Sequence, residues 1–392
     1  MMKLEGGFIQ NLGRVYGIYT LGFLGFVILM AILEQAGVSS DAIGWMFVGF
    51  TILIYALIGV LSRTMPSSEY YVAGRQVPAV FNGMATAADW MSGASFIAMA
   101  GGIYLGGYPY MAFLVGWTGG YVLVASLIAP YLRKFGCYTV PDFIGTRYGG
   151  NLARLCAVII LVVASFTYVT AQITGTGIVA SRALAIPFEV GVWIGLAGIL
   201  FCSMLGGMKA VTWTQVAQYI VLIIAYLLPV FWMSNSLDYG LIPQFAQFDA
   251  VLRVQELEAL HQVGILKPTA AAAAEAGGLK SLSVGINDAS DTLMAKWKFF
   301  TLVLCMMLGT ASLPHVLMRY FTTPSVKAAR QSVGWSLVFI FLLYFTAPAL
   351  ATFTKLSILD PNLATGIIGK SVADATALDW VQKWSNVGFV KI

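Results

Sequence analysis

The chain has 392 residues, of which 59% are hydrophobic and only 10% are charged, against roughly 25% charged residues in soluble domains. This composition excludes an ordinary soluble protein and predicts an all-α, polytopic membrane protein held in a lipid bilayer. The net charge of +5 comes from bases scattered between apolar runs. Because these bases form no patch or stripe, no nucleic-acid partner is expected.

Apolar runs long enough to cross a bilayer, about 20 residues each, follow one another from near the N-terminus. The first run is longer than a signal-peptide core and lacks a small-residue cleavage site, so we expect it to be retained. The runs predict about nine transmembrane helices, at 15–33, 44–62, 80–103, 110–132, 152–181, 188–206, 212–233, 297–317 and 332–353.

Lys and Arg residues set the expected orientation, because short cytoplasmic loops carry an excess of them. The opposite short loops carry only Arg182. We therefore expect a multi-pass protein of the plasma (inner) membrane with a cytoplasmic N-terminus. The bases assigned to the cytoplasmic span ends are Lys3, Arg14, Arg63, Arg75, Arg133, Lys134, Arg147, Arg154, Lys209, Arg319, Lys327 and Arg330.

Two segments interrupt the run of spans. The stretch 234–296 is predicted to be an extracytoplasmic loop, with a surface helix from Phe248 onward and a flexible Ala/Gly-rich segment after it. The stretch 355–392 is predicted to be an extracytoplasmic tail without a span of its own. Its mixed composition suggests a sequence that is truncated there.

Asp89 is the one acid expected well inside a span. A charge at the bilayer centre costs about 2.5–3.5 kcal/mol on insertion scales, so such a residue is a functional candidate by default. The structural alternative is a carboxyl group that only caps exposed backbone.

The surrounding stretch, 82–96, is rich in small and hydroxylated residues, which predicts a broken helix. Carbonyls freed at a break must line a cavity or bind a ligand, and oxygen ligands suit a hard cation such as sodium.

A second interrupted span is predicted at 308–315, where Gly309 and Pro314 favour a break. Breaks at matching places in two halves of a chain point to the midplane site of a transporter. The alternative is a proline kink that serves helix packing. His315, directly after the proline, is predicted to be a packed or interfacial residue rather than a proton relay.

Five stretches in chain order carry recognisable motifs: 69–75, 87–96, 138–143, 206–215 and 313–315 with Arg319. Together they resemble the sodium:solute symporter family, and within it an acetate-permease-like (cation:acetate) subgroup. The resemblance implies a leucine-transporter-like bundle of inverted repeats whose second repeat is incomplete. The expected organisation is two peripheral helices at 1–68, a five-helix repeat at 69–233, the loop at 234–296, two helices of the second repeat at 297–354, and the tail at 355–392.

The resemblance also implies a sodium ion held by the backbone carbonyls of Ala88 and Met91. We expect Asp89 and Ser92 to shape the field of this ion. The family's hydroxyl-bearing later helix is missing before Ile392, and Gln215 stands where many relatives carry Asp. One sodium ion per cycle is the cautious inference, and no other cofactor is expected.

The substrate site is expected at the same breaks. Because no Lys or Arg is predicted mid-span, a substrate carboxylate has to rely on half-helix ends, hydroxyl groups and the bound cation. The substrate-binding candidates are Gly93, Gly309, Thr310, Ser312 and Pro314.

These features predict sodium-coupled symport of a small monocarboxylate such as acetate by alternating access. One alternative keeps the fold and makes Asp89 a protonatable carrier in a proton-coupled carboxylate symporter. Another is a transporter-like sensor module of a signalling protein. A membrane enzyme is disfavoured because the spans contain no nucleophile and base in a catalytic arrangement.

Overall fold

The computed structural model describes residues 8–184, 186–264, 293–363, 365–366, 370 and 372–386, and its regular secondary structure there is helical. The chain divides into two compact units. Unit 1 comprises Met1–Ser92, Ala125–Ile224 and Leu313–Ser336; unit 2 comprises Gly93–Val124, Ala225–Ser312 and Leu337–Ile392.

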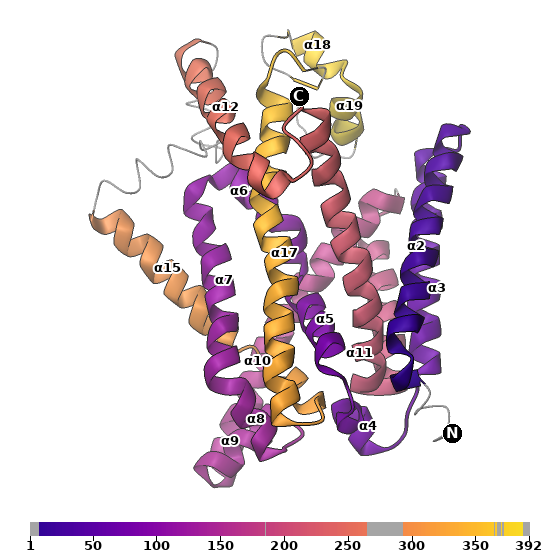
Figure 1. Cartoon of the computed structure of the whole chain (residues 1–392), viewed down its shortest axis with the longest axis vertical. Helices are drawn as coiled ribbons and strands as arrows, with labels where there is room; N and C mark the ends of the chain where they lie inside the picture. Colours follow the sequence, from indigo (N-terminus) through magenta and orange to yellow (C-terminus); the bar gives the residue numbers. More distant parts are fainter. Residues whose placement is uncertain are drawn as a thin grey trace. The chain divides into compact units, whose positions relative to one another are not determined.

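Figure 1 shows the helices of the chain. Two of the long ones, α11 and α17, begin in unit 1 and end in unit 2. The helices of unit 1 are α2 (Leu12–Gln35), α3 (Ser40–Leu61), α4 (Ser67–Val72), α5 (Ala79–Trp90), α8 (Ala129–Phe135), α9 (Val140–Tyr148), α10 (Asn151–Leu184), α16 (Pro314–Met318) and the short η5 (Arg319–Thr322), together with the beginnings of α11 (Phe188–Ser236) and α17 (Val326–Leu359).

Unit 2 holds the ends of α11 and α17 and the remaining helices. These are a π-helical turn (Ala94–Ala98), α6 (Met99–Gly106), the short η3 (Tyr108–Tyr110), α7 (Met111–Leu123), α12 (Pro243–Gly264), α15 (Leu293–Ala311), α18 (Val372–Thr376) and α19 (Asp379–Asn386). A second π-helical turn, Val124–Ile128, lies where α7 passes from unit 2 to unit 1.

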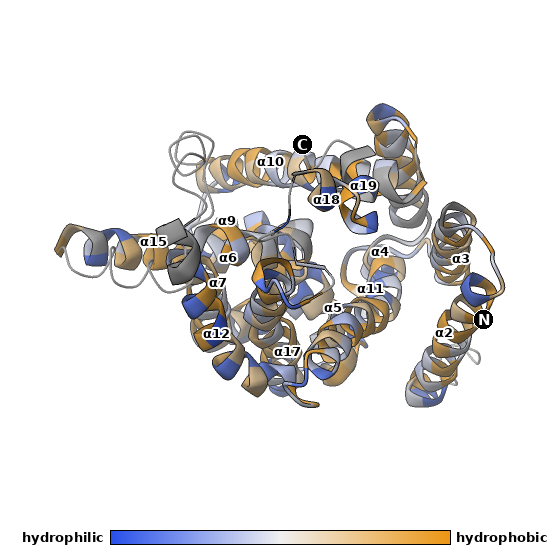
Figure 2. Cartoon of the chain, turned by 90° about the horizontal axis from the view of Figure 1, so that it is seen from above, coloured by the Kyte–Doolittle hydropathy of each residue, from blue (hydrophilic) through white to orange (hydrophobic). Residues whose placement is uncertain are grey.

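Six described helices are long and apolar enough to cross a membrane: Leu12–Gln35, Ala42–Leu61, Tyr108–Phe135, Asn151–Ser181, Gly206–Ser236 and Val326–Leu359. A bent pair, Lys296–Ala311 with Pro314–Thr322, makes a seventh if it is one span. Large apolar side chains point away from the protein on these helices; on α10, for example, Phe166 is 74% exposed. In Figure 2 much of α10 has the hydrophobic colour, interrupted by paler and bluish turns. Such surfaces suit contact with lipid, so this is a multi-pass membrane protein.

Two of the nine predicted spans differ from a continuous helix. The span at 80–103 is divided into α5, a π-helical turn and α6. The span at 297–317 is interrupted between α15 and α16. The predicted spans 188–206 and 212–233 both lie in α11, where Gly207, at φ 50° and ψ −139°, separates the two helical stretches. A Cβ atom at Gly207 would lie 2.5 Å from the carbonyl oxygen of Tyr70, so both its conformation and its close contact require glycine.

Both predicted helix breaks are present. The first helix ends at Trp90, and Met91 leaves the helical region at φ −74° and ψ 56°. The second ends at Ala311, and Leu313 is extended, as the residue before a proline favours. Pro314 then begins α16, where its missing N–H costs no helix bond. The boundary between the two units falls at each break, at Ser92/Gly93 and at Ser312/Leu313.

The core of unit 1 joins the N-terminal helix α2 to α5 and α11. Tyr16 and Leu12 are buried against Trp213 and Val216, and the Tyr16 hydroxyl donates to the Trp213 carbonyl at 2.9 Å. Because this hydroxyl has a buried acceptor, the aromatic ring can be buried without an unsatisfied polar group.

The core of unit 2 joins α12 to the end of α17. The predicted surface helix falls within α12, and it buries Ala250, Val254 and Leu257 against Phe353 and Leu356. Beside this contact, Lys355 is 1% exposed and pairs with Glu258. The Ala/Gly-rich segment predicted after this helix lies outside the described residues.

Gly83 allows α5 and α17 to approach closely within unit 1. A Cβ atom there would lie 2.7 Å from Trp335 Cβ and 3.1 Å from the backbone nitrogen of Ser336. We expect Gly83→Ala to destabilise the protein by about 1–3 kcal/mol through overpacking. The matched control is Gly101→Ala, where nothing lies within 4 Å and a gain of about 0.4–1 kcal/mol is expected. Thermal unfolding in detergent, followed by size-exclusion chromatography, measures both; equal shifts would contradict the prediction.

Candidate functional site

A buried ion pair joins the ends of the two broken helices that lie in unit 1. Arg319 Nε lies 2.5 Å from Asp89 Oδ2, and Arg319 Nη2 lies 3.3 Å from Asp89 Oδ1. The side chains of Arg319 and Asp89 are 2% and 9% exposed. A buried ion pair of this kind adds little to the net stability of the protein, but removing one partner leaves an uncompensated buried charge.

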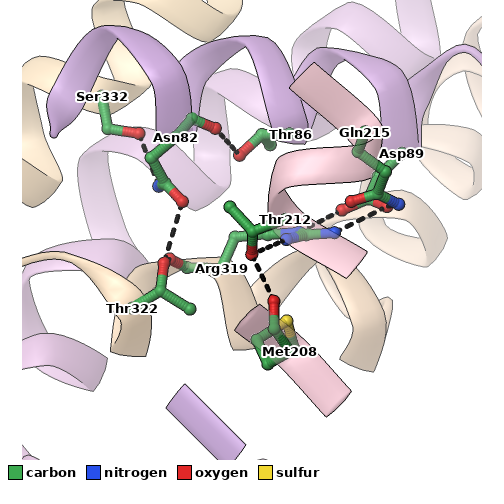
Figure 3. A network of polar contacts seen from close by, with 9 residues as sticks. All are labelled: Asn82, Thr86, Asp89, Met208, Thr212, Gln215, Arg319, Thr322 and Ser332. Atoms are coloured by element: carbon green, nitrogen blue, oxygen red, sulfur yellow. Dashed lines mark hydrogen bonds and ion pairs between the residues drawn. The ribbon is translucent and has the colours of Figure 1, made fainter. Parts of the chain in front are cut away.

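Two residues of α11 complete the surroundings of the pair (Figure 3). Thr212 accepts a hydrogen bond from Arg319 Nη1 at 2.8 Å and donates to the Met208 carbonyl at 2.6 Å. Gln215 Nε2 donates to Asp89 Oδ1. Both carboxylate oxygens of Asp89 therefore accept from nitrogen donors, as an ionised carboxylate requires.

A second group of buried polar residues connects α5 to α17 beside the ion pair (Figure 3). Asn82 Nδ2 donates to Ser332 Oγ at 2.7 Å. Thr322 Oγ1 lies 2.9 Å from Asn82 Oδ1 and 2.7 Å from the Arg319 carbonyl oxygen. Thr86 donates back to the Asn82 carbonyl at 2.7 Å. These hydrogen bonds hold α5 and η5 against each other, and so keep Asp89 and Arg319 in position for their ion pair.

Arg319 differs most from its sequence-based prediction. The sequence predicts Arg319 at a cytoplasmic span end, with no Lys or Arg mid-span, and assigns it no partner; in the structure its guanidinium is buried beside Asp89. A base a few residues after a proline break looks like a loop residue in a hydropathy pass. The available signal was Asp89 itself, because a buried acid calls for a basic partner.

The cation-binding candidates Ala88, Asp89, Met91 and Ser92 all lie in unit 1 at the end of α5. Met91 N–H still bonds to the Ala87 carbonyl at 2.8 Å, and the helix stops there. Ala88 and Met91 thus lie at the point where α5 ends, and backbone interrupted inside a membrane protein is tolerated where it lines a cavity or binds a ligand. Among the described residues, no group of three or more His, Cys, Asp or Glu side chains is placed to hold a metal ion.

Four of the five substrate-binding candidates, Gly93, Gly309, Thr310 and Ser312, lie in unit 2. Thr310 donates its hydroxyl proton to the Met306 carbonyl, and Ser312 donates to the Gly309 carbonyl at 2.8 Å. In this arrangement both oxygens present lone pairs, so binding a carboxylate requires each hydroxyl to leave its helix bond. Pro314, the fifth candidate, begins α16 in unit 1.

His315 packs against Tyr168 of α10 within unit 1. The two rings stack with centroids 4.4 Å apart, and the Tyr168 hydroxyl forms a side-chain hydrogen bond with Ser92. This agrees with the prediction of a packed histidine. Tyr168, which the sequence pattern did not single out, adds a polar contact to the first break.

Glu69 and Lys209 form an ion pair at 2.8 Å outside the buried network. The Lys209 ammonium and then the Thr64 hydroxyl hold the pKa of Glu69 below its ordinary value of 4.5. A lowered folded-state pKa means that the pair stabilises the fold above pH 4.5, and that this stabilisation is lost as pH falls through the folded value. Both side chains are partly exposed, which limits the effect to about 1 kcal/mol.

We therefore expect Glu69→Gln to lower the thermal midpoint at about pH 6, and this difference to shrink as pH falls below 4.5 and through the lowered folded-state pKa of Glu69. Paired melting curves across this range measure the difference. A difference that stays constant from pH 6 to pH 3 would show that the Glu69 charge is not its source.

Known proteins share sequence or fold with this chain. The model of the sodium:solute symporter family matches residues 70–383. An uncharacterised symporter of Cupriavidus necator is 38% identical, over 99% of this chain and 67% of its own length. A monocarboxylic acid transporter of Corynebacterium glutamicum is 30% identical, over 75% of this chain and 52% of its own length.

The fold is similar to that of a solved Na⁺-coupled sialic acid symporter in its substrate-bound outward-open state. The TM-score is 0.58 at 15% identity, covering 84% of this chain and 65% of that chain. This chain thus spans about half to two thirds of the length of these proteins.

The described residues form helices, two of them interrupted, in a leucine-transporter-like fold, and the family whose model matches is one of symporters rather than of enzymes. The chain belongs to the sodium:solute symporter family.

Proposed function

We propose that this protein is a secondary active transporter that couples sodium entry to the uptake of a small monocarboxylate such as acetate. The observation that carries the proposal is the pair of helix breaks, at Met91 and at Leu313, with the unit boundary at each. Membership of the family supports sodium coupling. The monocarboxylic acid transporter among its relatives supports the substrate class. We place it in the plasma (inner) membrane with a cytoplasmic N-terminus, on the distribution of Lys and Arg.

In this proposal the backbone carbonyls of Ala88 and Met91 and the hydroxyl of Ser92 ligate sodium. Asp89 is not a direct ligand, because Arg319 and Gln215 already donate to its carboxylate. Asp89 instead holds Arg319 against the end of α5 and keeps the break in shape. Since the ion pair has no net charge, carbonyl dipoles supply the attraction for the cation, which favours a small, hard ion.

The substrate carboxylate binds at the unit 2 side of the breaks, to Gly93, Gly309, Thr310 and Ser312, with Pro314 setting the second break. The hydroxyl protons of Thr310 and Ser312 turn from their own helices to the carboxylate on binding. This exchange of one acceptor for another costs little, because a hydrogen bond to a charged group is stronger than one to a neutral carbonyl.

Uptake of radiolabelled acetate by the reconstituted protein in proteoliposomes tests the proposal, with sodium and proton gradients imposed separately. We expect a sodium gradient at fixed pH to drive accumulation, and a proton gradient without sodium not to. The opposite result would establish the proton-coupled alternative. Uptake under neither gradient would favour the sensor alternative.

The Asp89 contacts argue against proton coupling through this residue. Both partners of its carboxylate donate hydrogen bonds, so a protonated Asp89 would have no acceptor in Arg319 or in the Gln215 amide nitrogen. In the observed arrangement these donors suit the ionised state of Asp89.

A further inference from the structure

The helix α12 of unit 2 has two apolar faces, and only one of them packs on protein. Its inner face buries Ala250, Val254 and Leu257 against α17. Its outer face, together with the turn before it, carries large apolar side chains that are between 56% and 73% exposed: Leu241, Ile242, Phe245, Phe248 and Leu252. Their spacing of three or four residues places them on one side of the helix. An apolar face of this kind marks a contact with another protein or with a membrane.

Contacts with α17 establish the level at which the outer face lies (Figure 1). Gln244 Nε2 donates to Thr346 Oγ1 at 2.9 Å, and further along α12, Glu258 pairs with Lys355. The two helices therefore run in the same direction. Before α12, the ring of Tyr239 lies 5.8 Å from that of Phe353. The chain thus turns back along α17 after α11 ends, and α12 begins beside Thr346.

Thr346 lies well inside a helix that is long and apolar enough to cross a membrane, Val326–Leu359. At the helical rise per residue, it lies about 20 Å before the end of α17. The Phe245 ring contacts Phe345 with centroids 5.7 Å apart, and Phe345 stacks on Phe341, which is 55% exposed, at 5.0 Å. The outer face of α12 is therefore continuous with an exposed apolar face of the spanning helix α17.

The beginning of α12 also suits a position out of water. The stretch 239–248 carries no charged residue. In the turn before the helix, Ser234 Oγ donates to the Gly240 carbonyl at 2.7 Å, and the Ile242 carbonyl accepts from the helix at 3.0 and 3.1 Å. Pro243 has no N–H to satisfy. Paired backbone groups of this kind are what hydrocarbon requires, because an unpaired group there is costly.

The polar side chains at the beginning of α12 turn away from the outer face. Gln244 bonds to Thr346, and Gln247, which is 5% exposed, donates to the Gln244 carbonyl at 2.7 Å. The outer face therefore has no hydrogen-bonding side chain before Asp249 at its edge. Protein interfaces carry a polar rim and regular hydrogen bonds, whereas acyl chains need neither. This composition favours lipid over a protein partner.

We propose that the outer face of α12 binds the acyl chains of the membrane lipids. The helix begins within the bilayer, beside the spanning part of α17, and leaves it between Phe248 and Glu256, where the same face becomes charged. The hydrophobic effect of this contact holds the beginning of α12 in the membrane, as it does for helices that lie at an interface.

Photolabelling of the full chain in nanodiscs tests the proposal without a variant. One probe is a phospholipid with a diazirine near the middle of an acyl chain, and the matched probe carries the diazirine on its headgroup. Adducts are assigned to residues by mass spectrometry. We expect the ratio of acyl to headgroup adducts at Phe245 and Phe248 to equal that at Phe341 within about twofold, and headgroup adducts to dominate at Glu256.

Two outcomes of this labelling would overturn the proposal. Acyl adducts at Phe341 without any at Leu241 to Phe248 would mean that protein covers the outer face, either a second copy or another segment. Headgroup adducts alone at Leu241 to Phe248 would mean that α12 lies above the acyl chains.

Two matched variants measure the same boundary by thiol chemistry. Phe248→Cys and Glu256→Cys are made in a chain whose four native cysteines are Ser, and both react in nanodiscs with a charged, water-soluble maleimide. Because the thiolate is the reactive form and apolar surroundings suppress it, Glu256→Cys should react about tenfold faster or more. Equal rates would contradict the proposal. Equal reaction after unfolding in SDS confirms that both thiols are intact.

Discussion

Replacing Asp89 with Asn is expected to destabilise the protein by about 3–5 kcal/mol. The guanidinium of Arg319, 2% exposed, would remain buried without its counter-charge. Arg319→Gln should cost a similar amount, since it leaves the Asp89 carboxylate buried. The double variant Asp89→Asn/Arg319→Gln removes both charges together and is expected to recover most of the loss. A double-mutant cycle on thermal unfolding in detergent measures this coupling.

The matched control is the pair Arg154–Asp142, with an N–O distance of 2.5 Å and an Arg154 side chain that is 61% exposed. Water screens that pair, so Arg154→Gln and Asp142→Asn should each change stability by less than about 1 kcal/mol. A double variant at the buried pair that is no more stable than the worse single variant would contradict the assignment. In that case the loss would come from disturbed packing of α5 rather than from an unpaired charge.

The breaks in the helices could be predicted from the sequence because their causes are local. Pro314 cannot donate a helix bond and forces Leu313 to be extended. The small residues before Met91 weaken the first helix, and Asp89 among them draws attention to it. At both breaks, the residues that cause the break are the same few residues whose backbone leaves the helix.

The partners of the ionisable residues could not be predicted in the same way. Asp89 and Arg319 are 230 positions apart, and Glu258 meets Lys355 only through the packing of α12 on α17. A single sequence shows which residues are charged, but not which residues lie next to them in the folded protein. The predicted boundary between the spans 188–206 and 212–233 does coincide with the turn at Gly207, whereas a hydropathy mean over a window does not show the π-helical turn after Gly93.

The second large effect is expected at Gln215, where the family resemblance leads one to expect Asp. Gln215→Asp exchanges a donor to Asp89 for a second negative charge, so that two carboxylates share one guanidinium. Without a cation, like charges this close are destabilising. We expect the variant to unfold at a lower temperature than the wild type in choline chloride, and sodium chloride at equal ionic strength to recover much of the difference.

The size of the sodium effect follows from binding to the folded state alone. A ligand at ten times its dissociation constant stabilises the fold by about 1.4 kcal/mol, which thermal unfolding in detergent resolves. Gln215→Asn is the control for a shorter side chain without a charge. Gln218→Asp is the control that places the same charge about one turn further along α11. Only Gln215→Asp should respond to sodium more strongly than the wild type. An equal response to sodium and choline would mean that Arg319 alone neutralises both carboxylates, and that position 215 does not determine a second cation site.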